Sequence, residues 1–361
     1  MPLTFACQPF YKNPEYPPMY VVQHQDGPVR CQRCKAYVSP NFKFLDGGRK
    51  MGCPFCQVSS DVPDWYQQHL DHNGFRIDKN HKAELCRGSF EYMATKDYCQ
   101  DGKLPDAPGF VFCIDVTTNA VSSGMVKVAC QKIKQMLDKL PKDRTEATSQ
   151  MRVGIICYTK VLHFFNVHKN LSTPKEMIVS DVDDIFVPLQ EGFLTNPMES
   201  RDLLDTLLDE IPNMFANSRV NESVFAPVIQ AGCEALKANN ANGKLFIFQS
   251  SGLPTAEAPG KLKPHEDKKL LGTNKEHLLW TSADKLYTKI AKDCVDCGVA
   301  VDTFLFTSQH VDIATLSECS NLTAGNWGWG HSALFLSSKL GHESISRVLI
   351  PSPCLQILIF Q

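Results

Sequence analysis

Cys31-Gln32-Arg33-Cys34 and, eighteen residues later, Cys53-Pro54-Phe55-Cys56 decide how the first part of this chain folds. Each C-x-x-C pair turns the backbone so that two thiolates face one point, and two such pairs at this spacing are typical of a structural zinc site. Four thiolates fill a tetrahedral shell and leave no position for water, so such a site stabilises a fold and catalyses nothing. The sequence predicts one structural Zn2+ on Cys31, Cys34, Cys53 and Cys56, with two disulfides or four unrelated thiols as the alternative.

Composition bears on the compartment and on the partners. The chain has 361 residues, 15 cysteines and a formal net charge of -2. Cys113, Cys130, Cys157 and Cys233 lie in apolar runs, where a reduced thiol behaves as a small hydrophobic group. No signal peptide opens the sequence, and no run approaches the ~18 apolar residues that span a bilayer. We therefore expect a cytosolic protein without a general attraction to nucleic acid, because the net charge is close to zero.

Five stretches differ in composition. We expect an extended, proline-punctuated segment over residues 1–29, the zinc finger over 30–60, and short strands with a Pro/Gly linker over 61–108. A larger α/β domain is expected over 109–325, and a tail of unusual composition over 326–361. The length agrees with about two domains.

Strand and helix patterns alternate from Phe110 onward. Residues 110–116 form a nearly continuous apolar run, as expected of a strand buried on both faces. Further strands are predicted over 152–158, 161–166, 244–248 and 299–306, and helices over 124–140, 196–211, 224–237 and 284–297. Alternation at these lengths predicts a mostly parallel, doubly wound sheet.

The first strand of this sheet ends in a polar motif, Asp115-Val116-Thr117-Thr118-Asn119. A von Willebrand factor A-like domain carries a metal motif, D-x-S-x-S, at this place. Asn119 occupies the position of the second hydroxyl and is a poorer ligand for Mg2+, so we interpret Asp115 as a buried carboxylate at the strand end. The competing function from another class is a metal-dependent phosphotransferase that uses Asp115 with Thr117.

Several motifs in order resemble one known family, the COPII vesicle-coat cargo adaptors (the Sec-twenty-four family). In the finger the resemblance rests on residues 29–37, Gly47-Gly48-Arg49, Cys53-Pro54-Phe55-Cys56 and Asp61-Val62-Pro63. It continues through residues 112–116, 161–164, 224–227, 253–254, 260–262 and 301–306, and so covers roughly residues 14–325. The GTPase-activating coat subunit shares the architecture, but the V-R-C-x-R-C-x-x-Y phrasing favours the adaptor.

The resemblance implies a fold and a non-enzymatic role. It implies an α/β chain in which a zinc ribbon and partial β-barrel strands precede a von Willebrand factor A-like trunk. It further implies that the trunk pairs with the GTPase-activating subunit of the inner COPII coat, which a membrane-bound small GTPase recruits. The adaptor binds sorting signals in the cytosolic tails of cargo proteins and SNAREs during transport from the endoplasmic reticulum to the Golgi. The expected location is peripheral, at endoplasmic reticulum exit sites and on vesicles.

Basic residues near the finger match the family's pocket for acidic cargo signals. Arg30 and Lys35 flank the first C-x-x-C pair, and Lys261 and Lys263 lie in a later loop. Since the chain is nearly neutral overall, an acidic signal needs a fixed local cluster of positive charge. The resemblance therefore implies cargo-binding roles for Arg30 and Lys35, against the alternative that both are solvated surface charges, and we expect Lys261 and Lys263 to add further positive charge to this site.

The tail departs from the family pattern. After Leu322-Thr323-Ala324-Gly325 the family's remaining β-barrel, helical and gelsolin-like parts do not follow. We expect residues 326–361 to be disordered or loosely collapsed, and the strands near residues 88–98 to lack neighbours. A truncated isoform with little function of its own is the second alternative.

Overall fold

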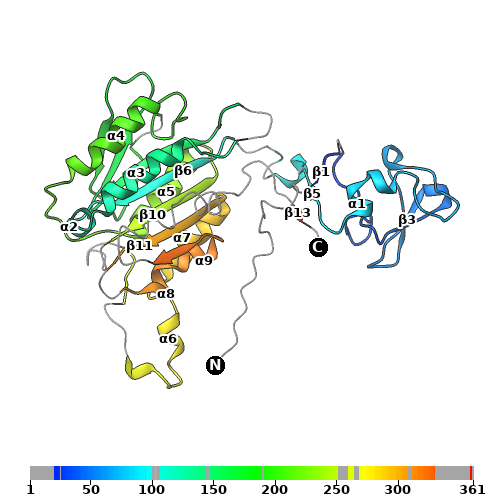
Figure 1. Ribbon diagram of the computed structural model, residues 1–361. Helices are drawn as coiled ribbons and strands as arrows, with labels where there is room; N and C mark the ends of the chain where they lie inside the picture. Colours follow the sequence, from blue (N-terminus) through cyan, green and yellow to red (C-terminus); the bar gives the residue numbers. More distant parts are fainter. Residues whose placement is uncertain are drawn as a thin grey trace. The chain divides into compact units, whose positions relative to one another are not determined.

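The chain forms two compact units, one of residues 1–104 with 354–361 and one of residues 105–353, each described here by itself. The computed structural model (Figure 1) describes residues 20–329 and 358–359, apart from 25, 94, 100–101, 103–105, 143–146, 189–190, 251–258, 264–267 and 308–310. Most of the expected N-terminal segment, residues 1–19, therefore lies outside the described residues. So does most of the expected tail, residues 330–357 and 360–361.

The finger of the first unit contains a three-stranded antiparallel sheet. Its order is β2 (Lys43–Leu45), β3 (Lys50–Gly52) and β4 (Ser59–Asp61). The turn between β2 and β3 is formed by Asp46–Gly48. Gly48 takes φ 95°, and a Cβ there would lie 1.9 Å from the carbonyl oxygen of Gln68, so glycine is required.

A second small sheet lies in the first unit. Strand β5 (Glu91–Tyr92) pairs in parallel with β1 (Val21–Val22) and antiparallel with β13 (Leu358–Ile359). Helix α1 (Ala83–Cys86) precedes β5 along the chain. The strand expected near residue 90 is therefore present, and it has a neighbour on each side.

The second unit is built on a seven-stranded sheet. Its order is β12-β11-β10-β6-β7-β8-β9, in which the first five strands are parallel and β8 and β9 are antiparallel to their neighbours. The strands are β6 (Gly109–Asp115), β7 (Arg152–Tyr158), β8 (Leu162–Asn166), β9 (Lys175–Val179), β10 (Gly243–Gln249), β11 (Val299–Leu305) and β12 (Trp327–Trp329). The chain runs outward from β6 in both directions, which is the doubly wound order.

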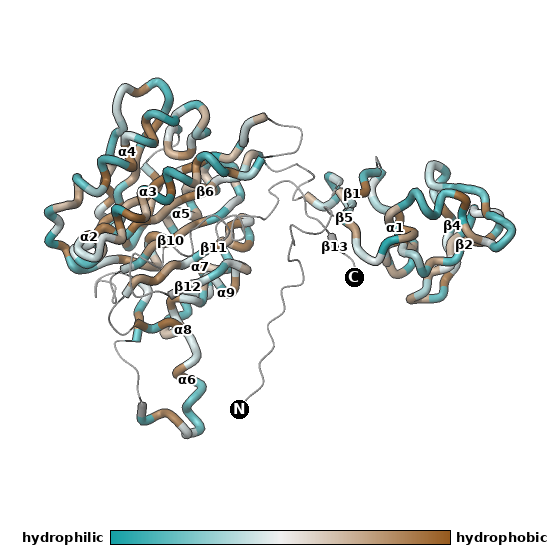
Figure 2. Tube along the Cα trace, in the orientation of Figure 1, coloured by the Kyte–Doolittle hydropathy of each residue, from teal (hydrophilic) through white to brown (hydrophobic). Residues whose placement is uncertain are grey.

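Helices cover both faces of this sheet, and the central strand divides its side chains between them. Phe110, Phe112 and Ile114 of β6 join the core beneath α3 and α4, whereas Val111 and Cys113 join the core beneath α5 and α7. The central strands are accordingly hydrophobic throughout (Figure 2). The helices are α2 (Thr118–Ser122), α3 (Met125–Leu137), α4 (Arg201–Met214), α5 (Ala226–Ala238), α6 (His277–Trp280), α7 (Lys285–Asp296), α8 (Ile313–Leu316) and α9 (Glu318–Leu322).

The predicted fold class is confirmed: an α/β chain with a four-cysteine ribbon ahead of a doubly wound sheet. Several elements differ from expectation. Helix α4 begins at Arg201 and contains Pro212, although we expected it to start near residue 196 and to end before that proline. Strand β9 was not predicted, and β12 extends the sheet into the range expected as tail. No helix in the described part of the chain is both long enough and apolar enough to cross a bilayer.

Candidate functional site: a four-cysteine zinc centre and its cationic flank

The first C-x-x-C pair forms a tight turn that aims both sulfurs inward. The backbone N–H of Lys35 donates to the carbonyl oxygen of Cys31 at 3.0 Å, and the N–H of Cys31 donates to the carbonyl oxygen of Ala36 at 2.8 Å. Lys35 takes the left-handed conformation, with φ 61°. These bonds fix the backbone around the two thiols before any metal binds.

The second pair repeats this turn. The N–H of Gln57 donates to the carbonyl oxygen of Cys53, and the N–H of Cys53 donates to the carbonyl oxygen of Val58, both at 3.0 Å. Gln57 is also left-handed, with φ 59°, at the position that corresponds to Lys35. The finger therefore presents two equivalent thiol pairs to one point.

The four sulfurs form a cluster of the size that zinc requires. Cys31 Sγ lies 3.6 Å from Cys56 Sγ, and Cys34 Sγ lies 3.5 Å from Cys53 Sγ. All four sulfur atoms lie within 4.8 Å of one another, and all four cysteines are free, so the disulfide alternative is wrong. A tetrahedral zinc with Zn–S bonds of about 2.3 Å places its sulfurs about 3.8 Å apart. The donor set therefore fits one structural Zn2+.

Cys31 is the ligand prepared most clearly for metal binding. Its pKa is lowered to about 6, chiefly because the backbone N–H of Cys34 donates to its sulfur. The N–H of Arg33 and the side chains of Cys56 and Ser60 act in the same direction, whereas burial opposes them. Because the thiolate is the form that binds metal, these donors favour zinc binding at neutral pH.

Arg30 lies directly before the first zinc ligand and is held between two aromatic rings. Its guanidinium carbon is 4.7 Å from the ring centre of Tyr37 and 4.7 Å from that of Tyr98. The two tyrosine hydroxyls are 2.7 Å apart, and the backbone of Arg30 forms an antiparallel bridge with Tyr37. Arg30 is thus half-buried and oriented, and the ion pairs of the described residues do not include it.

Lys35 and Phe55 lie in the two C-x-x-C turns, which we call the zinc knuckles (residues 31–35 and 53–57). Lys35 is exposed, and its left-handed backbone is part of the turn that holds the first pair of thiols. Phe55 is 72 % exposed between Cys53 and Cys56. The finger therefore presents a cation and an aromatic ring to solvent, in addition to the half-buried Arg30.

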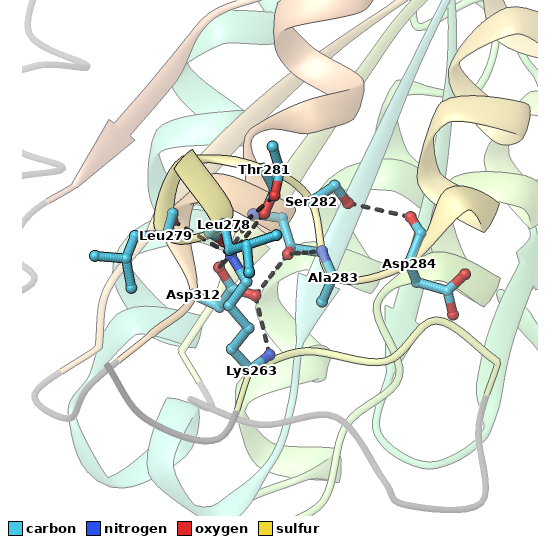
Figure 3. A network of polar contacts seen from close by, with 9 residues as sticks. Lys263, Leu278, Leu279, Thr281, Ser282, Ala283, Asp284 and Asp312 are labelled. Carbon is cyan, nitrogen blue, oxygen red and sulfur yellow. Dashed lines mark hydrogen bonds and ion pairs between the residues drawn. The ribbon is translucent and has the colours of Figure 1, made fainter. Parts of the chain in front are cut away.

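The other two expected cargo residues belong to the second unit. Lys261 is exposed, and its backbone N–H donates to Asp284. Lys263 is half-buried, and its ammonium donates to the carbonyl oxygens of Leu278, Leu279 and Thr281 at 2.8, 3.3 and 2.6 Å (Figure 3). An ammonium has three donors, so Lys263 has none left for an external carboxylate.

Asp115 is a buried carboxylate whose two oxygens both accept backbone donors. The N–H of Thr117 donates to Oδ1 at 2.9 Å, and the N–H of Ser250 donates to Oδ2 at 2.8 Å. Asn119 is exposed, and among the described residues only the four cysteines form a cluster of three or more metal-binding side chains. Asp115 therefore connects the ends of β6 and β10 through hydrogen bonds. This geometry does not favour a role of Asp115 in phosphoryl transfer.

A closed four-thiolate finger followed by a doubly wound α/β domain defines a class of zinc-stabilised α/β protein. Comparison with known protein families and related proteins shows which family within this class the chain resembles. The family described as the Sec23/Sec24 trunk domain matches residues 105–333, and the Sec23/Sec24 zinc finger matches residues 28–66. Human protein transport protein Sec24D is 53% identical over 327 residues, which cover 90% of this chain and 32% of the relative.

Two further comparisons agree. Human protein transport protein Sec24C is 50% identical over 328 residues, which cover 90% of this chain and 30% of the relative. The crystal structure of the human COPII-coat protein Sec24c has a TM-score of 0.86 and 47% identity, covering 93% of this chain and 45% of that chain. The chain therefore belongs to the Sec24 family, and the expected resemblance is confirmed. It spans about a third of the length of the curated relatives that it matches.

The sequence predicted the zinc ligands, which the structure brings together, but it gave no sign of the tyrosine pair around Arg30. Tyr37 belongs to the family-like stretch 29–37, whereas Tyr98 lies in none of the motifs described above. Arg30, Tyr37 and Tyr98 are too far apart in the sequence to form a recognisable local motif. The left-handed conformation of Lys35 and Gln57 also has no sequence signal, because neither residue is a glycine or an asparagine.

Proposed function

We propose that this chain acts as a cargo-recognition adaptor of the COPII coat in transport from the endoplasmic reticulum to the Golgi. Family membership over both the finger and the trunk supports this role. The closed zinc shell and the internally bonded Asp115 also favour binding over catalysis. The trunk pairs with the GTPase-activating subunit of the inner coat, and the small GTPase acts on the chain indirectly through that pairing.

The fixed position of the Arg30 side chain is the main observation that supports a cargo-binding role. Its guanidinium is fixed by two tyrosine rings, and a fixed guanidinium presents a planar fork of donors that matches a carboxylate. Lys35 adds an exposed positive charge five residues later, and the zinc knuckle holds the backbone between them. We infer that acidic sorting signals in cargo and SNARE tails bind here. Lys261 adds charge in the second unit, whereas the donors of Lys263 are already used.

Titration of a di-acidic cargo peptide tests this assignment. Arg30→Glu reverses the charge at the centre of the site and should abolish binding, while zinc content and trunk pairing stay unchanged. Arg87→Glu is the matched control, because Arg87 also lies over a tyrosine of the first unit, 5.2 Å from the ring centre of Tyr20. Equal peptide affinity for Arg30→Glu and the wild-type chain would remove Arg30 from the site.

On this proposal the protein is located peripherally, on exit sites of the endoplasmic reticulum and on COPII vesicles. Binding to the membrane surface then comes from the assembled coat and from contacts of the chain itself. The near-neutral net charge of -2 means that any such contact depends on a local patch.

A further inference from the structure

The hydroxyl of Tyr98 lies beside the cation of the proposed cargo site. It is 2.7 Å from the hydroxyl of Tyr37, and the guanidinium carbon of Arg30 is 4.7 Å from the centre of each of the two rings. Arg30 forms no ion pair with a carboxylate of the described residues. A group of negative charge placed on one of these hydroxyls would therefore have an oriented guanidinium within reach.

The two tyrosines differ in how the chain holds them. The backbone of Tyr37 is paired with that of Arg30, and its ring stacks on Tyr92 with 5.8 Å between the ring centres. Tyr98 instead ends the short helical turn Lys96–Tyr98, whose first two residues are exposed. Segments outside a paired strand open locally at a lower cost in free energy than paired segments do. Tyr98 therefore carries the hydroxyl that a modifying enzyme reaches more easily.

A phosphate on Tyr98 would occupy the donors of Arg30. A phosphotyrosine carries a charge of about -1.5 to -2 at neutral pH and presents three acceptor oxygens, and a guanidinium binds such a group through two parallel hydrogen bonds. The exposed Lys96 and Asp97 of the same turn carry opposite charges, so the turn is close to neutral before modification. The donors that we assign to an acidic cargo signal would then bind a phosphate of the chain itself.

We propose that phosphorylation of Tyr98 closes the cargo site. A protein tyrosine kinase transfers the γ-phosphoryl group of ATP: Tyr98 Oη bonds to the γ-phosphorus, the bond from that phosphorus to the bridging oxygen of ADP breaks, and the phenolic proton passes to the catalytic aspartate of the kinase. The phosphate then pairs with Arg30 and excludes the carboxylates of a cargo signal. This inference rests on the proposed cargo function and adds its regulation, whereas the pairing of the phosphate with Arg30 does not depend on what the site binds.

Treatment of the zinc-loaded full chain with a tyrosine kinase and ATP, followed by peptide mapping, tests the proposal. The chain phosphorylated at Tyr98 should bind a di-acidic peptide roughly tenfold more weakly than the untreated chain in isothermal titration. Tyr98→Phe keeps the ring, and its affinity should not change on kinase treatment. Tyr20→Phe is the matched control, because Tyr20 also lies beside an arginine, 5.2 Å from Arg87, and this variant should lose affinity on treatment as the wild-type chain does.

Phosphorus NMR tests the contact between the phosphate and Arg30 without any cargo peptide. A guanidinium beside the phosphate favours its doubly charged form, so the second pKa of the group should fall by about one unit from its ordinary value of about 6. Arg30→Gln removes the positive charge and should restore the ordinary pKa. The phosphorylated wild-type chain and the phosphorylated Arg30→Gln variant are compared under the same conditions.

Three results would overturn the proposal. The first is the absence of phosphate on Tyr98 after kinase treatment, and the second is the same phosphate pKa in the wild-type chain and in Arg30→Gln. The third is equal peptide affinity before and after phosphorylation of Tyr98. A lowered phosphate pKa in a chain that binds no di-acidic peptide even when unmodified would support the pairing with Arg30 and contradict the proposed cargo function.

Discussion

The guanidinium carbon of Arg30 lies 4.7 Å from the ring centre of Tyr98, although Arg30 borders the finger and Tyr98 lies in a short turn after β5. The hydroxyl of Tyr98 is in turn 2.7 Å from that of Tyr37, so the two rings enclose the cation together. The direction in which Arg30 points is therefore set partly by residues outside the zinc finger. This relationship makes the proposed cargo site dependent on the whole first unit.

Tyr98→Ala should weaken binding of a di-acidic peptide about two- to fivefold, because a cation–π contact at a partly exposed site contributes about 0.5–1 kcal/mol. Tyr98→Phe keeps the ring and should retain most of the affinity. Zinc content should be the same in both variants, since Tyr98 is not one of the four cysteines that form the zinc site. Isothermal titration with one peptide and both variants makes the comparison. Equal affinity for Tyr98→Ala and the wild-type chain would mean that the ring does not position Arg30.

Cys53→Ser should release the metal and unfold the finger. Cys53 is buried, and zinc binding to a small finger contributes free energy on the order of 10 kcal/mol to its folding. The variant should contain no zinc and should lose amide protection over residues ~30–60, while β6 to β11 keep theirs. Cys86→Ser is the control, because Cys86 is an exposed free cysteine of the same unit. Stoichiometric zinc and an unchanged melting curve in Cys53→Ser would contradict the assignment.

Local spacing explains what the sequence could predict about the site. Two C-x-x-C pairs define their own turns through bonds between residues four and five apart, so the ligands were identifiable without a structure. The contact between Arg30 and Tyr98 joins two segments that are far apart in the chain. Neither segment contains a sequence pattern that predicts the contact. The same is true of Lys263, whose three acceptors come from a helix end that periodicity did not predict.

The differences between the predicted and the observed secondary structure have similar physical causes. Strand β9 is an edge strand whose first four residues are exposed, so it lacks the apolar pattern by which β6 and β7 were recognised. Pro212 was expected to stop α4, but it lies in the last turn, and the helix ends two residues later at Met214, so the proline removes one i−4 hydrogen bond next to the natural end of the helix. The short β12 is specified by pairing with β11, and its sequence resembled a tail.

Lys244→Met should destabilise the second unit at neutral pH by about 3–5 kcal/mol, because it removes the partner of a buried charge. Lys244 Nζ lies 2.8 Å from Asp302 Oδ2, and the two side chains are 5% and 0% exposed. Burial raises the pKa of Asp302, and Lys244 opposes that rise. Chemical denaturation of the variant and of the wild-type chain gives the difference in unfolding free energy.

The pH dependence of this difference has a definite sign. A carboxyl whose pKa is raised in the native state binds protons more tightly there than in the unfolded state, so its contribution to stability falls as pH rises above the ordinary range. Lys244→Met should therefore cost less at about pH 5 than at about pH 8, since Asp302 is more protonated at the lower pH. The double variant Lys244→Met with Asp302→Asn carries no buried charge here and should not show this dependence. An equal loss at both pH values would contradict the account.

Association with the GTPase-activating subunit of the inner COPII coat tests the central claim most directly. Sedimentation velocity of the zinc-loaded chain, alone and mixed with that subunit at micromolar concentration, separates free chains from a complex. We expect a single species with the mass of a one-to-one complex, formed equally well by the wild-type chain and by Arg30→Glu. A wild-type chain that stays at the mass of the free protein in the mixture would contradict its proposed role as a coat adaptor.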